Sequence, residues 1–175
     1  EIIQKGLLSG VIKKQNTDKV TLGGFVTTDK IVAIGSSTGG TIALEYILQN
    51  LPANLPPILI VQHMPPGFTG QFAGRLCELS QLRVKESEDG EIVTNGTVYI
   101  AKGGFHMVTE RRGNNLFIRH ASTERVHFQK PAVDELFNSL VKTVGQNALA
   151  ILLTGMGRDG ADGLLNLKKS GSHTI

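Results

Sequence analysis

The sequence lacks tryptophan, has a single cysteine, and contains no long apolar run. Because Cys77 has no second cysteine to pair with, an internal disulfide is excluded, which is consistent with a reducing compartment. No apolar stretch approaches the roughly 18 residues that a membrane-spanning helix needs, and the start shows no signal-peptide pattern. We therefore expect a soluble protein that does not insert into a membrane.

A strong charge of one sign is also missing. The formal net charge is +3, and the basic residues are dispersed apart from the pairs Lys13-Lys14, Arg111-Arg112 and Lys168-Lys169. Nucleic-acid binding usually combines a concentrated basic patch with stacking aromatic residues, whereas this chain has only two tyrosines. We therefore expect no nucleic-acid partner, while the weak positive charge leaves open an attraction to an acidic protein.

The length of 175 residues, with 40% hydrophobic residues and 21 glycines, indicates one globular domain with many tight turns. Residues 1–29 show weak periodicity and are expected to form a linker or N-terminal arm, whereas residues 30–175 are expected to form the folded domain. The chain begins with Glu1, without a methionine, and stops at Ile175, where another strand is expected to begin. Both ends indicate a piece of a longer polypeptide.

Apolar strands alternate with amphipathic helices along the chain. Continuous apolar runs, typical of strands buried on both faces of a parallel sheet, cover residues 31–34, 57–62 and 148–154. Helical spacing covers residues 41–51, 68–80, 131–144 and 162–169. Short strands are expected at 83–87, 92–93, 97–101, 105–110 and 116–120, with a hairpin turn at 113–115. The pattern predicts an α/β fold: a doubly wound, mostly parallel sheet with helices on both faces and an antiparallel β-hairpin insertion.

The stretch Gly35-Ser36-Ser37-Thr38-Gly39 fits the G-x-S-x-G pattern of a nucleophile elbow, with Ser37 at its centre. It follows an apolar strand and precedes a helix, so a sharp turn there would expose the Ser37 hydroxyl at the carboxyl end of the strand. A phosphate-binding loop and a plain turn are alternatives. The dinucleotide fingerprint is absent because Ser37 replaces its middle glycine, and no Gly-Lys-Ser/Thr sequence closes a phosphate loop.

A serine nucleophile needs a base, and His63 is the leading candidate because it ends the second apolar strand and is followed by two prolines. Asp159, in the glycine-rich loop after the third strand, is the leading carboxylate to orient the imidazole, with a helix N-cap as the alternative role. Asp162 is the rival carboxylate but fits the first turn of the next helix better. The backbone N–H groups of Thr38 and Met156 are the candidates for binding an oxyanion.

The remaining histidines are weaker candidates. His106 is a candidate to line the cleft, His120 and His127 are expected on the surface, and His173 lies near the end of the chain. No two histidines have the spacing of a zinc site, so no metal is expected.

Three blocks taken together resemble one family: Ala33–Thr41, Gln62–Thr69 and Leu153–Ala161. In order and spacing they are similar to the catalytic domain of bacterial chemotaxis protein-glutamate methylesterases, over roughly residues 30–175. The resemblance implies a cofactor-free, cytoplasmic hydrolase with Ser37 as nucleophile, His63 as general base and then acid, and Asp159 as orienting carboxylate. It assigns Thr38 and Met156 to the oxyanion region.

The same resemblance implies a substrate and a regulatory partner. The family demethylates glutamate methyl esters on the cytoplasmic helices of chemoreceptors, and some members also deamidate glutamines there. Members normally carry a phosphorylatable N-terminal receiver domain, for which residues 1–29 have no room, and a C-terminal strand and helix that we expect to be missing after Ile175. Two local departures are Ser36, where alanine is frequent, and Lys102-Gly103-Gly104-Phe105 before His106.

Two other functions remain open on the sequence. The Gly35–Gly40 loop fits a nucleotide- or phosphate-binding α/β module, although a phosphate-loop lysine is missing. A non-catalytic docking domain that keeps the fold is the other alternative.

Overall fold

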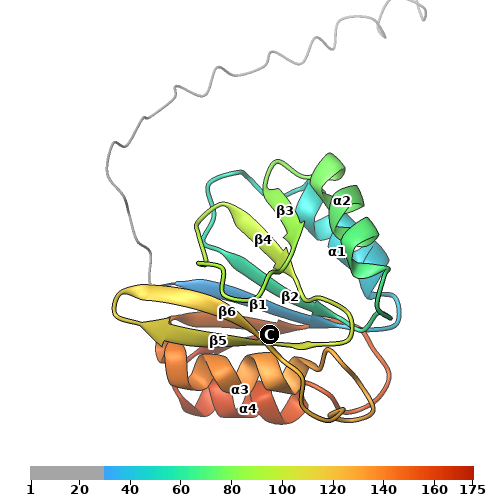
Figure 1. The fold of residues 1–175 in the computed structure, drawn as a ribbon. Helices are drawn as coiled ribbons and strands as arrows, with labels where there is room; N and C mark the ends of the chain where they lie inside the picture. Colours follow the sequence, from blue (N-terminus) through green and yellow to red (C-terminus); the bar gives the residue numbers. More distant parts are fainter. Residues whose placement is uncertain (1–29) are drawn as a thin grey trace, which may run out of the picture.

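The computed structural model describes residues 30–175, so the arm expected at residues 1–29 lies outside the described residues. A six-stranded sheet forms the centre of the molecule, with the strand order β3-β4-β2-β1-β7-β8 (Figure 1). Every neighbouring pair in this sheet is parallel. The strands are β1 (Ile31–Ser36), β2 (Ile58–Gln62), β3 (Arg83–Glu86), β4 (Thr97–Ile100), β7 (Ala148–Leu152) and β8 (His173–Thr174).

The three apolar runs of the sequence form the middle of this sheet. β2 is buried along its whole length, and β1 lies between β2 and β7. In register, Ser36 of β1 is opposite Gln62 of β2, and Gly35 is opposite Leu152 of β7. The carboxyl ends of all three strands therefore lie at the same edge of the sheet.

Helices cover both faces, as the alternating pattern predicts. α1 (Gly40–Gln49) and α2 (Thr69–Leu79) lie on one face, while α3 (Val133–Thr143) and α4 (Ala161–Lys169) lie on the other (Figure 1). Each face has its own apolar core, one containing Leu44, Leu48 and Leu76, the other containing Leu136 and Phe137. The predicted doubly wound arrangement is confirmed.

The middle of the chain divides between the main sheet and the insertion. β3 and β4 extend the parallel sheet at its edge, whereas β5 (His106–Arg112) and β6 (Asn115–Ala121) pair as the predicted antiparallel hairpin. Met107 and Ile118 of the hairpin are fully buried in the core on the α3 side. The short strand expected at 92–93 is reduced to a single bridge between Ile92 and Phe117.

Element boundaries differ locally from the expected ones. The helix expected from Pro131 begins at Val133, because Ala132 is extended with φ −112° and ψ 142°. The last apolar strand ends at Leu152, two residues early, and a one-turn 3-10 helix (Gly145–Asn147) precedes it. The chain was expected to stop before its next strand, but residues 173 and 174 already form β8, which pairs with Leu149 and Ala150 of β7.

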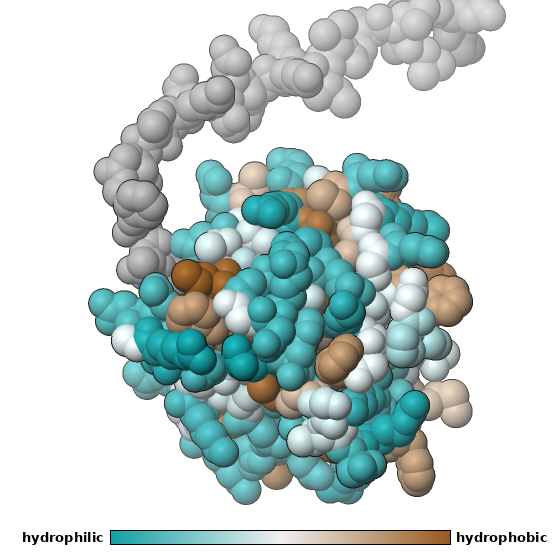
Figure 2. All heavy atoms as spheres, viewed as in Figure 1, coloured by the Kyte–Doolittle hydropathy of each residue, from teal (hydrophilic) through white to brown (hydrophobic). Residues whose placement is uncertain are grey.

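The surface shown in Figure 2 is mostly hydrophilic, with apolar side chains in small separate groups. Across residues 30–175, no helix combines the length and the apolar character needed to cross a bilayer.

Candidate active site

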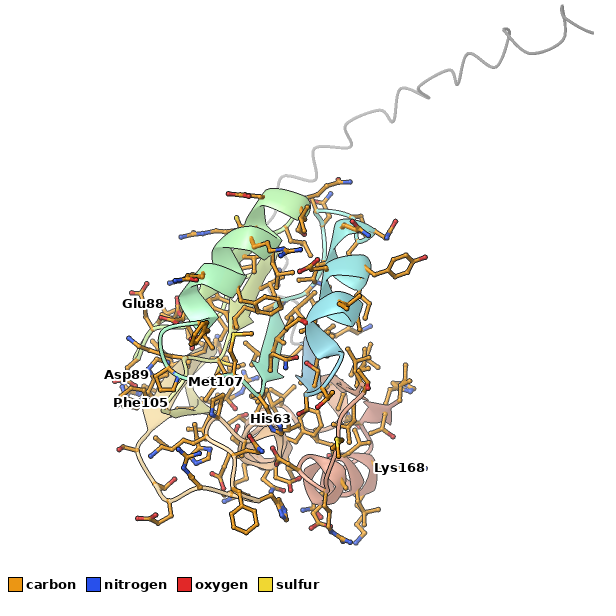
Figure 3. The ribbon with its side chains drawn as sticks, turned by 90° about the vertical axis from the view of Figure 1, so that its right-hand side faces the viewer. His63, Glu88, Asp89, Phe105, Met107 and Lys168 are labelled. Carbon is orange, nitrogen blue, oxygen red and sulfur yellow. The ribbon has the colours of Figure 1, made fainter. Side chains whose placement is uncertain are left out.

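The loops that follow β1, β2 and β7 bring Ser37, His63 and Asp159 together. The Ser37 Oγ atom lies 3.0 Å from Nδ1 of His63, and Nε2 of His63 lies 2.6 Å from Oδ2 of Asp159. Figure 3 shows His63 just beyond the ends of the central strands. Residues separated by up to 122 positions in the sequence thus form one continuous chain of hydrogen-bonding side chains.

Main-chain hydrogen bonds extend the sheet into these loops and hold them together. The N–H of His63 donates to the carbonyl of Ser36 at 3.0 Å, and the N–H of Ser37 donates to the carbonyl of Thr154 at 2.9 Å. The Thr154 hydroxyl donates in turn to the carbonyl of Thr38 at 3.0 Å. The Ser37 turn is therefore fixed to the loops of both neighbouring strands, and Thr154 is a contributor that the sequence did not reveal.

The two adjacent serines lie in different environments. Ser36 is the last residue of β1, is 2% exposed, and donates its hydroxyl to Oε1 of Gln62 at 2.7 Å. Ser37 lies just beyond the strand, and its hydroxyl lies within hydrogen-bond distance of the His63 imidazole. Only the second of these hydroxyls is in a position to pass a proton to His63.

The Asp159 carboxylate connects the imidazole to the N-terminus of α3. Its side chain is 4% exposed, and its oxygens accept from the N–H of Val133 at 2.7 Å and that of Asp134 at 3.0 Å. Burial acts to raise the pKa of Asp159, but the hydrogen bonds from His63, Asp134 and Val133 outweigh it, so the pKa lies below its ordinary value. Asp159 is thus ionised at neutral pH and also caps a helix, although α3 and not the α4 that follows it.

An ionised Asp159 determines which imidazole nitrogen carries the proton. A carboxylate only accepts hydrogen bonds, so Nε2 of His63 must donate to it. In neutral His63 the other nitrogen, Nδ1, then has a free lone pair directed at the Ser37 hydroxyl. This tautomer is the one that can accept a proton from the serine.

The low pKa of Asp159 predicts a stability loss in acid. The unfolded chain, whose Asp159 has the ordinary, higher pKa, binds a proton first as the pH falls. The contribution of Asp159 is therefore complete above about pH 4 and is lost as the pH falls further through the folded-state pKa. Urea denaturation of the wild type and Asp159→Ala is expected to show a stability difference that shrinks below about pH 4. A difference that stays constant down to the acid limit of folding would contradict the carboxylate role.

The two residues predicted for the oxyanion region lie on exposed loops at the carboxyl edge of the central sheet, where Ser37 also lies. The N–H groups of Thr38 and Met156 have no hydrogen-bond acceptor within the part of the chain that the structure describes. Thr38 directly precedes Gly39, the N-cap residue of α1, which is left-handed with φ 79° and supplies no side-chain cap. Unpaired N–H groups at a helix N-terminus attract negative charge, so the predicted oxyanion role of Thr38 is chemically available.

Gly155 lies against the serine, where a larger residue does not fit. A Cβ atom at this position would be 2.8 Å from Cβ of Ser37. We expect Gly155→Ala to displace Ser37 and to slow the labelling of its hydroxyl by a serine-directed fluorophosphonate about 10- to 100-fold, since a displacement of about 1 Å can slow a reaction by up to that factor. Gly74→Ala in α2, where an added Cβ meets nothing within 4 Å, is the matched control and should be labelled at the wild-type rate. Equal labelling rates in both variants would contradict the expected displacement.

The loop that departs from the family pattern packs beside His63. A Cβ atom on Gly103 would lie 2.7 Å from Cα of Pro66, so Lys102-Gly103-Gly104 can approach the prolines that follow His63 only with glycine there. Phe105 stacks on His120, with ring centroids 5.6 Å apart.

Two histidines outside the predicted site make hydrogen bonds that hold parts of the fold together. His106, considered for the cleft, is fully buried: Nε2 is 2.9 Å from the carbonyl of Glu124, and Nδ1 accepts from the N–H of Ala132 at 3.1 Å. It therefore connects two backbone segments. His120, expected on the surface, lies 2.9 Å from the Ser87 hydroxyl, and partial burial lowers its pKa despite opposing nearby carboxylates.

The rival carboxylate Asp162 lies in the first turn of α4, where its sequence context places it, and pairs with Arg158 at 2.9 Å. Together with His127 and Asp134 it forms a group whose potential ligand atoms lie within 4.8 Å of one another. Asp134 is already bonded to the N–H of Gly163 and paired with His127 at 3.1 Å. The group thus joins α3, α4 and the loop before α3 through polar contacts, which the sequence spacing did not indicate.

Comparisons with known proteins agree with one another. The family described as CheB methylesterase matches residues 32–175. A protein-glutamate methylesterase/protein-glutamine glutaminase of Sulfurimonas denitrificans is 48% identical over 149 residues, covering 85% of this chain and 42% of that protein. The protein of that name from Escherichia coli K12 is 48% identical over 153 residues, covering 87% and 44%.

The chain thus spans less than half the length of these curated relatives. Among solved structures, the catalytic domain of the Thermotoga maritima CheB methylesterase superposes with a TM-score of 0.82 and 45% identity, covering 83% of this chain and 78% of that one. The chain belongs to the CheB methylesterase family.

Proposed function

We propose that this chain is a serine hydrolase that demethylates glutamate methyl esters on chemoreceptor proteins. The observation that carries the proposal is the unbroken series of contacts from Ser37 through His63 to Asp159. The names of the relatives, which cover both methylesterase and glutaminase activity, support the choice of substrate.

The reaction follows from the roles of the three side chains. The Ser37 oxygen attacks the ester carbonyl while His63 takes the hydroxyl proton on Nδ1. The imidazolium, held through Nε2 by Asp159, returns this proton to the leaving methoxide, and methanol departs. Water then attacks the acyl-enzyme with His63 again as base, which frees the glutamate carboxyl and restores the Ser37 hydroxyl.

Negative charge develops on the former carbonyl oxygen in both steps. The N–H groups of Thr38 and Met156 are proposed to bind it, since both are exposed near Ser37 and free of other acceptors among residues 30–175. The site also suits a glutamine side chain, because the proton on His63 would then leave with ammonia. Deamidation is accordingly part of the proposed activity.

The proposed partners follow from the substrate. The chain would act in the cytoplasm on the receptor's helical signalling region, and a receiver domain of the same polypeptide would control access to Ser37. The exposed apolar side chains of Phe68 and Met156, 58% and 82% exposed, lie in loops at the edge of the sheet that carries Ser37, where a docked helix would contact them.

A fluorophosphonate probe tests the proposal directly. It reacts covalently with an activated serine and should modify Ser37 alone, as located by peptide mass spectrometry. The absence of any labelling would favour a docking domain instead. Calorimetric titration with common nucleotides tests the phosphate-binding alternative, and micromolar binding would support it.

A further inference from the structure

Gln62, which the sequence pattern did not single out, lies between the nucleophile and the base. It is the last residue of β2 and is 3% exposed. Its Nε2 atom donates to the carbonyl of Ser37 at 2.9 Å and to the carbonyl of His63 at 3.2 Å. One side-chain amide thus contacts the backbone of both residues that must exchange a proton.

The two carbonyls determine how this amide is oriented, because a carbonyl oxygen can only accept a hydrogen bond. The NH₂ group therefore faces both carbonyls, and the buried Ser36 hydroxyl donates to Oε1 of Gln62 at 2.7 Å and holds it in place. The reverse orientation would direct the NH₂ group at the Ser36 hydroxyl and the amide oxygen at two carbonyl oxygens. Gly40 of α1 leaves the necessary space, since a Cβ there would overlap Oε1.

The two carbonyls depend on the hydrogen bond from Gln62 to different degrees. The Ser37 carbonyl also accepts from the N–H of Gly40 at 2.8 Å. For the His63 carbonyl, Gln62 is the only donor within the described range 30–175. Without the amide, the His63 carbonyl at the end of β2 would lose its hydrogen bond and its connection to the Ser37 turn.

We propose that Gln62, held in place by Ser36, is a positioning residue that sets the distance between Ser37 and His63. The inference rests on the proposed hydrolase function. A planar amide bonded to both backbones restricts the relative movement of the loops, and proton transfer between Oγ and Nδ1 is sensitive to shifts well below 1 Å. A glutamine that merely satisfied buried carbonyls would affect stability and not the rate of the chemical step.

The experiment compares Gln62→Met, which keeps the length of the side chain but cannot donate or accept as an amide, with Ser36→Ala, which removes only the hydroxyl that anchors the amide oxygen. We expect kcat for methyl-ester hydrolysis to fall about 100-fold in Gln62→Met and about 10-fold in Ser36→Ala. KM should stay within about twofold, because neither side chain is placed to bind substrate. The rate of fluorophosphonate labelling at Ser37 should fall in parallel, since the probe requires only an activated serine.

Ser172→Ala is the matched control for stability. Ser172 is also a buried serine, 8% exposed, and its hydroxyl donates to the carbonyl of Gly145 at 2.8 Å, next to β8 at the opposite edge of the sheet. The Ser172→Ala variant should lower the urea midpoint by about as much as Ser36→Ala does, while leaving kcat and the labelling rate unchanged.

The outcomes separate this inference from the function on which it rests. If Gln62→Met and Ser36→Ala label and turn over like the wild type while only their urea midpoints fall, the positioning role is wrong. If Gln62→Met does not fold, Ser36→Ala alone decides by the same criterion. A wild-type protein that neither hydrolyses the ester nor reacts with the probe overturns the proposed function, and this inference with it.

Discussion

Replacing Ser37 with alanine is expected to lower kcat for glutamyl methyl-ester hydrolysis by about 10⁴- to 10⁶-fold. The variant loses the atom that forms the acyl-enzyme, and the remaining groups can only bind substrate and polarise its carbonyl. Folding should be unaffected, because the hydroxyl forms a hydrogen bond only with the His63 imidazole among the described residues and the Ser37 backbone bonds remain. Methanol release and urea denaturation measure the two effects.

The neighbouring serine is the internal comparison. Ser36→Ala keeps the nucleophile and is expected to lose only about tenfold, in line with the loss of one hydrogen bond. If Ser36→Ala lost more activity than Ser37→Ala, the nucleophile would be Ser36, and the buried position of that hydroxyl would have to change during the reaction.

Replacing Asp159 with asparagine is expected to lower kcat by about 10⁴-fold while leaving KM nearly unchanged. An amide NH₂ in place of Oδ2 would donate to Nε2 of His63 and so favour the tautomer with the proton on Nδ1, which faces Ser37. That histidine cannot accept the serine proton. In either amide orientation, one N–H at the start of α3 also faces the NH₂ group, which should cost about 1–3 kcal/mol of folding stability.

Asp162→Asn is the matched control for this prediction. Asp162 is a nearby carboxylate, but it is exposed and paired with Arg158 at the surface, so its loss should change activity and stability little. Steady-state hydrolysis and thermal denaturation of the two variants provide the test. A larger loss of activity in Asp162→Asn than in Asp159→Asn would exchange the roles of the two carboxylates.

Local sequence patterns were sufficient for most of the fold. Continuous apolar runs such as 57–62 are typical of central strands buried on both faces, and the glycines flanking Ser37 permit a sharp turn into α1. The predictions were weakest between residues 83 and 101, where β3 and β4 join the parallel sheet. Their short, half-polar runs carry no periodicity that distinguishes a parallel edge strand from a hairpin.

The site likewise divides into residues that the sequence predicted and contacts that it did not. Its three central side chains were predicted because each follows an apolar strand at the carboxyl edge of a parallel sheet, where loops converge. The supporting contacts were not predictable in this way. Thr154 reaches Thr38 across 116 positions, and the N–H groups that hold Asp159 belong to α3, 25 and 26 residues away from it.

By itself, the sequence determined the alternation of strands and helices, the turn that carries Ser37, and the family to which the chain belongs. Tertiary structure alone decided that Ser36 is buried and Ser37 faces His63, that Asp159 is held ionised by His63 and by a helix N-terminus, and that Gln62 contacts both loops. The physical reason is range: propensity and periodicity act between neighbours along the chain, whereas hydrogen-bond direction and burial depend on atoms brought together only when the sheet forms.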